Sequence, residues 1–111
     1  MKTTLFALTI ALVSTSVLAQ QVIPSEEVRQ LVSGKTVDFG QDGSASYGTD
    51  GKYEYFNKNN GSRSRGTWSL QGDRLCVAFD NGRSRCDQFL KDGGRTVLKD
   101  SQGRTFSVSI R

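Results

Sequence analysis

Hydrophobic and polar residues follow three different patterns along the chain, and the first pattern covers residues 1–19. Lys2 stands near the start, an apolar stretch spans residues 5–13, and small residues lead up to Ala19. This order is typical of a secretory signal peptide. The apolar stretch is much shorter than the roughly 20 residues that a membrane-spanning helix needs. We therefore predict cleavage after Ala19, an exported protein that is periplasmic or secreted, and no transmembrane segment in the mature chain.

The second pattern has the period of an α-helix. Val28, Leu31 and Val32 are spaced so that they share one face of a helix, and Gly34 follows as a typical residue beyond a helix C-terminus. The pattern predicts one short N-terminal helix over residues 25–33. A helix of this length is not stable alone, so its apolar face must pack on the rest of the domain.

The third pattern, from Gly34 onward, consists of short segments in which apolar and polar residues alternate. Turn signals such as Asn-Gly and Asp-Gly recur about every ten residues between these segments. These dipeptides are preferred in tight turns because the backbone there needs a positive φ. The predicted strands span residues 36–41, 44–49, 52–57, 62–70, 73–80, 83–91, 95–100 and 104–110.

A sheet of eight short strands joined by hairpins has two unpaired edges unless it closes on itself. The sequence therefore predicts a mainly β fold, a small antiparallel eight-stranded meander or barrel with one short N-terminal helix. It forms a single domain over residues 20–111. An eight-stranded barrel is just wide enough to be filled by its own side chains or to hold one small ligand. The sequence leaves these two alternatives open.

The two cysteines, Cys76 and Cys86, flank a predicted hairpin turn. In an oxidising compartment they are expected to form a disulfide. A three-residue loop over residues 80–82 places them directly opposite each other, but it also sets Val77 on the same face as Arg85. A two-residue loop separates apolar from charged residues better, but it turns Cys76 to the opposite face from Cys86. The sequence leaves both registers open.

The composition excludes several kinds of chemistry. The chain has no histidine, which is the most frequent acid-base residue near neutral pH and the most frequent metal ligand. It also has no Gly-rich phosphate loop, nucleophile elbow or metal-ligand spacing. We therefore predict no catalytic residues, no metal site and no cofactor, and we do not expect an enzyme.

An Arg-Ser-Arg triplet that occurs twice is the most distinctive polar feature. Arg63 and Arg65 begin one predicted strand, and Arg83 and Arg85 begin the next strand that runs in the same direction. The four guanidinium groups are therefore expected near one end of the sheet, as a candidate site for an anion or an acidic partner. The alternative is a solvated rim in which nearby aspartates balance the arginines.

Tyr53, Tyr55 and Trp68 are candidate aromatic contacts on the predicted strands, and a structural role is the alternative for each. Strand aromatics and a net charge of +4 also occur in nucleic-acid-binding proteins. The positive excess is small, however, and an exported protein rarely meets nucleic acid. No nucleic-acid partner is predicted.

Residues 25–36, Asp50-Gly51, Gly66-Thr67-Trp68, residues 72–76 and Arg85-Cys86 follow one another in an order that carries a resemblance. The chain resembles small exported proteins of alphaproteobacteria that form uncharacterised families. This resemblance implies a periplasmic or secreted β-barrel with a hairpin disulfide, and it implies no activity or catalytic residues.

Ser46-Tyr47-Gly48 and Trp68 are similar to elements of a second family, the bacterial periplasmic lysozyme inhibitors. These inhibitors are small eight-stranded barrels with disulfides. From the sequence we predict a non-catalytic exported bacterial protein that binds an envelope component, an anionic ligand or a partner protein. The alternative is a periplasmic inhibitor of lysozyme or of another exported hydrolase.

Export is expected to remove residues 1–19. When the full chain is produced in a bacterium with a periplasm, mass spectrometry of the product should show a mature chain that begins at Gln20. Ala19→Arg should block this processing, because the cleavage site needs a small residue. A wild-type product that retains residues 1–19 would contradict the prediction.

Overall fold

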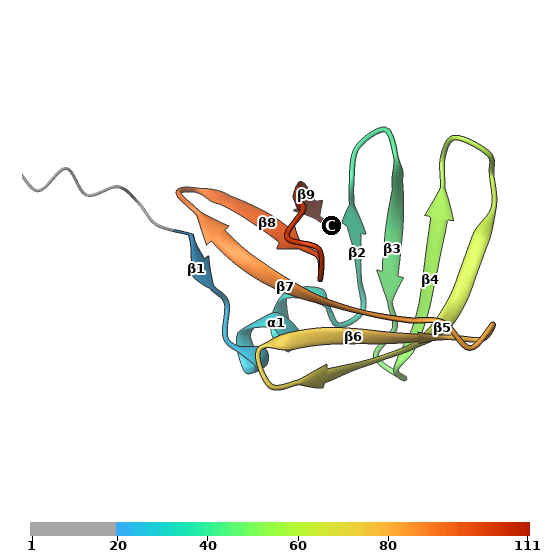
Figure 1. Ribbon diagram of the computed structural model, residues 1–111, viewed down its shortest axis with the longest axis horizontal. Coiled ribbons are helices and arrows are strands. Elements are labelled where there is room, and N and C mark those ends of the chain that lie inside the picture. Colours follow the sequence, from blue (N-terminus) through green and yellow to red (C-terminus); the bar gives the residue numbers. More distant parts are fainter. Residues whose placement is uncertain (1–19) are drawn as a thin grey trace, which may run out of the picture.

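The computed structural model describes residues 20–111 (Figure 1). The predicted signal peptide, residues 1–19, lies outside the described residues. Within residues 20–111 the chain forms one short helix, α1 (Ser25–Val32), and nine strands. The strands are β1 (Gln21–Val22), β2 (Lys35–Asp38), β3 (Gly43–Tyr47), β4 (Lys52–Asn57), β5 (Arg63–Gln71), β6 (Arg74–Phe79), β7 (Ser84–Asp92), β8 (Arg95–Lys99) and β9 (Thr105–Ile110). No helix in this range is long and apolar enough to cross a membrane.

Eight strands, β2 to β9, form a closed antiparallel barrel. Each strand pairs with the next one along the chain, and β9 returns to pair with β2, where Val37 lies opposite Ile110. Thr36 and Arg111 extend this closure through two backbone hydrogen bonds, each of 2.9 Å. Closure joins the first and last strands, which an open meander would leave as unpaired edges. The mainly β fold and the short helix predicted from the sequence are therefore confirmed.

The short strand β1 is not among the strands that the sequence predicts. It pairs with the second half of β7, where Val22 lies opposite Leu90. β6 pairs only with the first half of β7, up to Asp87. Between the two pairings, the Ile23 amide donates a hydrogen bond of 2.8 Å to the carbonyl of Phe89. β1 therefore pairs with the part of β7 that β6 does not reach.

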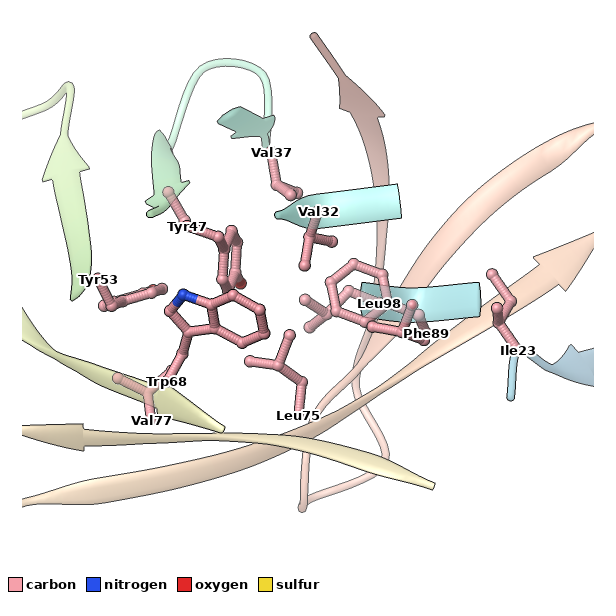
Figure 2. Packing of buried hydrophobic residues seen from close by; sticks show 12 residues of the cluster. Ile23, Val32, Val37, Tyr47, Tyr53, Trp68, Leu75, Val77, Phe89 and Leu98 are labelled. Carbon is pink, nitrogen blue, oxygen red and sulfur yellow. The ribbon is translucent and has the colours of Figure 1, made fainter. Parts of the chain in front are cut away.

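The interior of the barrel is filled by its own side chains, as Figure 2 shows. Tyr47 packs edge-to-face against Tyr53 and Trp68, with ring centroids 5.1 and 5.8 Å apart. Trp68 also donates a hydrogen bond of 2.9 Å from Nε1 to the carbonyl of Gly48. The core consists of Ile23, Val28, Val32, Val37, Ala45, Tyr47, Tyr53, Trp68, Leu75, Val77, Phe89 and Leu98. Of the two alternatives that the sequence leaves open, the structure adopts the filled barrel.

Helix α1 closes one end of the barrel. Its buried residues Val28 and Val32 join the core, and the helix packs on β2, β5 and β6. The hydroxyl of Ser25 donates a hydrogen bond to the carbonyl of Gly72 in the turn between β5 and β6. The opposite end, which we call the open end, is bordered by the turns that follow β2, β4, β6 and β8.

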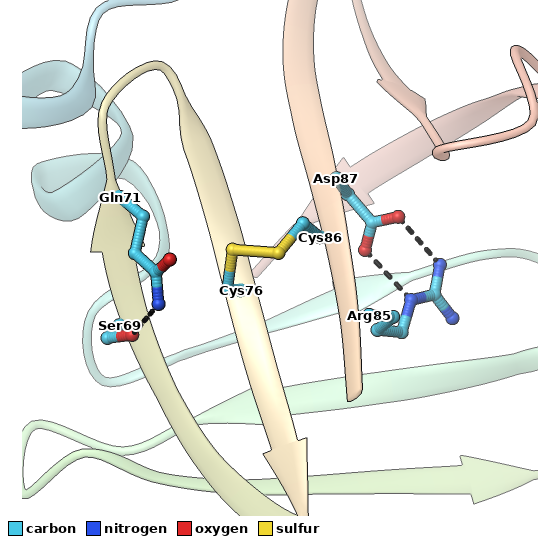
Figure 3. Close-up of a disulfide and its surroundings, with 6 residues drawn as sticks. All are labelled: Ser69, Gln71, Cys76, Arg85, Cys86 and Asp87. Carbon is cyan, nitrogen blue, oxygen red and sulfur yellow. Dashed lines mark hydrogen bonds and ion pairs between the residues drawn. A yellow bond between two sulfur atoms is a disulfide. The ribbon is translucent and has the colours of Figure 1, made fainter. Parts of the chain in front are cut away.

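The hairpin of β6 and β7 adopts the register of the three-residue loop. Cys76 lies directly opposite Cys86, and the two residues form a disulfide on the outer face (Figure 3). Gly82 closes the turn with a φ of 87°, a conformation that glycine adopts without strain. The same register places Arg85 opposite Val77, on the inner face of the wall. The register that permits the disulfide therefore also places the charged side chain of Arg85 inside the barrel.

Removal of the disulfide is expected to destabilise the domain by about 2 to 3 kcal/mol, because a cross-link that closes so short a loop restricts the unfolded chain by about that amount. The cysteines are separated by 10 positions. The measurement is urea unfolding of residues 20–111 carrying Cys76→Ala and Cys86→Ala, compared with the oxidised wild type. The wild type in reducing agent serves as the control and should show a similar loss. An unchanged unfolding midpoint in both cases would show that the bond is not stabilising.

Candidate binding site at the open end of the barrel

Arg63 and Arg65 lie on the outer wall of the barrel. Arg65 lies directly opposite Glu54 across β4 and β5. Both arginines bind this carboxylate, at 2.5 Å from Arg63 Nη1 and at 2.9 Å from Arg65 Nε. Arg63 also stacks on Phe56, with its guanidinium carbon 4.7 Å from the ring centroid. Hydrogen bonds from Arg65 and Arg63 hold the pKa of Glu54 below its ordinary value, which is the behaviour of a carboxylate already bound to cations.

Arg85 points into the barrel. It shares the inner face of β7 with Asp87, because alternate residues of a strand point the same way. Arg85 donates two hydrogen bonds to Asp87, of 2.9 Å from Nε and 3.1 Å from Nη2 (Figure 3). The Asp87 side chain is 4% exposed, whereas the Arg85 side chain is 37% exposed. The pair therefore reaches from the buried interior to the surface of the open end.

The four arginines of the two triplets do not form one cluster. Arg63 and Arg65 share the outer wall, Arg85 lies on the inner face, and Arg83 is exposed in the turn between β6 and β7. All four arginines lie toward the open end, as expected, but they do not share one face, so the expected single cluster of four guanidinium groups is not formed. The reason is strand alternation: Trp68 faces the core, which turns Arg63 and Arg65 outward, whereas the register of β6 and β7 turns Arg85 inward.

Two of the three candidate aromatic contacts belong to the core. Tyr53 is 4% exposed and Trp68 is 9% exposed. Burial raises the pKa of Tyr53 above its ordinary range, so its hydroxyl stays protonated. Tyr55, two residues further along β4, is half-buried at the open end. Of the three candidates, Tyr55 is therefore the most exposed.

Three half-buried aromatic rings surround a small cavity at the open end. Phe39 packs edge-to-face against Tyr55 and Phe106, with centroids 6.0 and 6.4 Å apart. These rings, together with Asp42 and Arg85, line a cavity of about 90 Å³. We call this cavity the aromatic notch. Phe39 and Asp42 come from the turn after β2, so the notch is part of the open end.

A second depression, of about 230 Å³, adjoins the aromatic notch, since Arg85 and Phe106 line both. The turn between β8 and β9 forms its other side. There Asp100 accepts hydrogen bonds from Arg104, of 2.7 Å from Nε and 2.9 Å from the backbone amide. Each arginine that borders this depression therefore has a carboxylate partner.

The pair of Arg85 and Asp87 adds no net charge to the open end. Burial raises the pKa of Asp87, and the hydrogen bonds and positive charge of Arg85 offset this effect only in part. Burial lowers the pKa of Arg85, but Asp87 outweighs burial, and the net shift is upward. The bidentate geometry matches a carboxylate to a guanidinium. Nη1 of Arg85 has no hydrogen-bond acceptor among residues 20–111 and is available to a ligand.

Sequence reasoning did not identify Phe39, Asp42 or Phe106 as site residues. Phe39 and Asp42 belong to the turn after β2, and Phe106 lies next to the turn before β9. An aromatic residue beside a turn lies at the rim of a barrel, so the positions of Phe39 and Phe106 indicate a place at a rim. They do not indicate which rim is open, because the alternation of apolar and polar residues does not show which end of the barrel the helix closes.

No group of Cys, Asp or Glu side chains among residues 20–111 is arranged to hold a metal ion. Comparison of the chain with protein-family models, curated proteins and solved structures finds no match. The kind of ligand that the site can bind is therefore inferred from its own side chains. They offer aromatic faces, one partly exposed guanidinium and the carboxylate of Asp42, which together suit binding.

Removal of one partner of the inner ion pair is expected to destabilise the domain more than removal of both. Arg85→Met leaves Asp87 buried without a cation, and we expect a loss of about 2 to 3 kcal/mol, since Arg85 is partly exposed. Arg85→Met combined with Asp87→Leu replaces the pair with apolar side chains and should recover most of that loss. Urea unfolding of residues 20–111 at pH 7 measures both variants. Equal losses in the single and double variants would contradict this account.

Proposed function

We propose that the chain is a non-catalytic exported protein that binds a partner protein through the open end of its barrel. The observation that carries the proposal is the aromatic notch, where Phe39, Tyr55 and Phe106 are half-buried around a cavity. The large aromatic side chains deeper in the barrel are fully packed in the core. Aromatic residues at the centre of a concave site, with polar residues around them, are typical of protein interfaces.

The open shape of the site favours a protein partner over a free small ligand. The notch of about 90 Å³ adjoins the depression of about 230 Å³, and both are open to solvent. Pockets for drug-sized molecules bury most of the surface of their ligand, which an open hollow does not. A single side chain that protrudes from a larger surface fits the notch, while the rest of that surface contacts the surrounding turns.

The rim of the notch carries charges of both signs in ion pairs. Lys58 binds Asp38 at 3.2 Å, and Arg104 binds Asp100 at 2.7 Å. Such a rim supplies orientation and hydrogen bonds, while the aromatic centre supplies hydrophobic contact. An anionic ligand is one of the classes expected from the sequence. Its attraction to Arg85 is weakened at this end, because Arg85 already has a carboxylate partner.

The first step of the test identifies the partner. A photo-crosslinking amino acid replaces Gln102, which is exposed in the turn between β8 and β9, and a control replaces Ser69 on the outer wall. A protein that crosslinks from position 102 and not from position 69 is then purified. Its affinity for residues 20–111 is measured by calorimetry, and its activity is assayed if it is a hydrolase, which covers the inhibitor alternative.

The second step compares two neighbouring aromatic residues of β4. Tyr55→Ala removes a ring of the notch and is expected to weaken binding at least about fivefold, the effect of an interface residue that contributes about 1 kcal/mol. Phe56→Ala, its matched control, removes a ring stacked under Arg63 on the outer wall and should change the affinity less than about twofold. Thermal unfolding confirms that both variants are folded. Equal weakening by both variants, or no binding by any purified crosslinked protein, overturns the proposal.

A further inference from the structure

The aromatic notch contains one carboxylate that no cation holds. Asp42 lines the notch, is exposed, and makes no ion pair with any residue of 20–111. The other carboxylates near it, Asp38, Asp87 and Asp100, each bind a lysine or an arginine. The charge of Asp42 also reaches Tyr55, whose pKa is raised first by burial and then by this carboxylate, with a smaller opposing effect of Arg85. Asp42 is therefore an unmatched negative charge at the edge of the notch.

Arg85 does not cancel this charge. It is the one cation that lines the notch within the described residues, and its guanidinium is bound in bidentate fashion by Asp87 directly behind it. The two charges of that pair balance each other. The notch and the pair together therefore carry one net negative charge, which belongs to Asp42.

The aromatic rings add to the attraction for a cation. The face of an aromatic ring is negative, and a cation within about 6 Å of the centroid is attracted to it. Phe39 packs edge-to-face against Tyr55 and against Phe106, at interplanar angles of 63° and 86°. Each of these contacts covers part of one ring face, and the parts of the three rings that line the notch remain open to a group inside it.

The size of the notch suits the end of one side chain. It measures about 90 Å³ and is the smaller of the two adjoining hollows at the open end. A terminal ammonium or guanidinium group can enter it with the methylene next to that group. We propose that the aromatic notch binds the cationic end of a lysine or arginine side chain on the partner protein. This inference rests on the proposed function and specifies the group that the partner inserts.

The positive net charge of the whole chain, +4, does not oppose this inference. Charges separated by more than about 10 Å are largely screened at 0.1 M salt. The charges in contact with the inserted group are those of the notch. One basic side chain is sufficient, and the partner need not be a basic protein.

The test is a titration that does not depend on knowing the partner. Residues 20–111, labelled with ¹⁵N, are titrated in about 0.1 M salt with N-acetyl-lysine amide, and with N-acetyl-norleucine amide and N-acetyl-glutamate amide as neutral and anionic probes. The lysine probe is expected to shift the amide signals of residues 39–43, Tyr55 and Phe106 in a saturable way, with millimolar affinity. This affinity should be at least about fivefold higher than that of either other probe.

Two matched variants test the role of the carboxylate. Asp42→Asn should reduce binding of the lysine probe to the level of the norleucine probe. Asp80→Asn removes the same charge from a residue that lines a groove on the outer wall, and it should leave binding unchanged. Both side chains are exposed and make no ion pair among residues 20–111, so neither substitution is expected to disturb the fold.

Several results would overturn the inference. These are tighter binding of the glutamate probe, equal effects of the two variants, or no saturable shift with the lysine probe. The outcome is separable from that of the proposed function. If the purified partner depends on Tyr55 but is unaffected by Asp42→Asn, the proposed function stands and the cationic group is wrong. If the lysine probe binds and no partner does, the proposed function fails.

Discussion

The pairing of β6 with β7 is the constraint on which the rest of the structure depends. The bond between Cys76 and Cys86 requires these residues to be directly opposite each other. Because side chains alternate along a strand, a slip of one residue would turn every side chain of β7 to the other face. The register that permits the disulfide therefore also brings Arg85 and Asp87 inside the barrel. Two charges in the interior are tolerated because they bind each other through two hydrogen bonds.

The position of this pair shapes the open end. Helix α1 closes the other end with apolar side chains, and the core extends from it through Tyr47 and Trp68. Above that core, the carboxylate of Asp87 is buried and the guanidinium of Arg85 reaches the surface. The aromatic rings around Arg85 are half-buried for this reason: a polar group takes the place of the apolar side chain that would complete the core. The notch is a consequence of how the barrel is filled.

The charges of this protein act locally and not as a general basic surface. Arg63 and Arg65 share the carboxylate of Glu54, and Arg85 binds Asp87, so three of the four triplet arginines have a carboxylate partner in the fold. Arg83 is exposed and makes no ion pair among residues 20–111. Within the aromatic notch, the charge without a partner among residues 20–111 is that of Asp42, and it is negative. A net charge counts residues, whereas recognition depends on which of them are already paired.

The amino-acid sequence alone determined the eight short strands, their antiparallel order and the short helix, because hydrophobic alternation and Gly-containing turns act within a few residues of each other. It did not determine β1, whose two residues are ordered only by pairing with β7. It also left the register of the disulfide hairpin open, since either loop satisfied local rules. Tertiary structure decided that register, and with it whether Arg85 faced in or out. Phe39, Asp42 and Phe106 meet only when β9 pairs with β2, so closure of the barrel formed the candidate site.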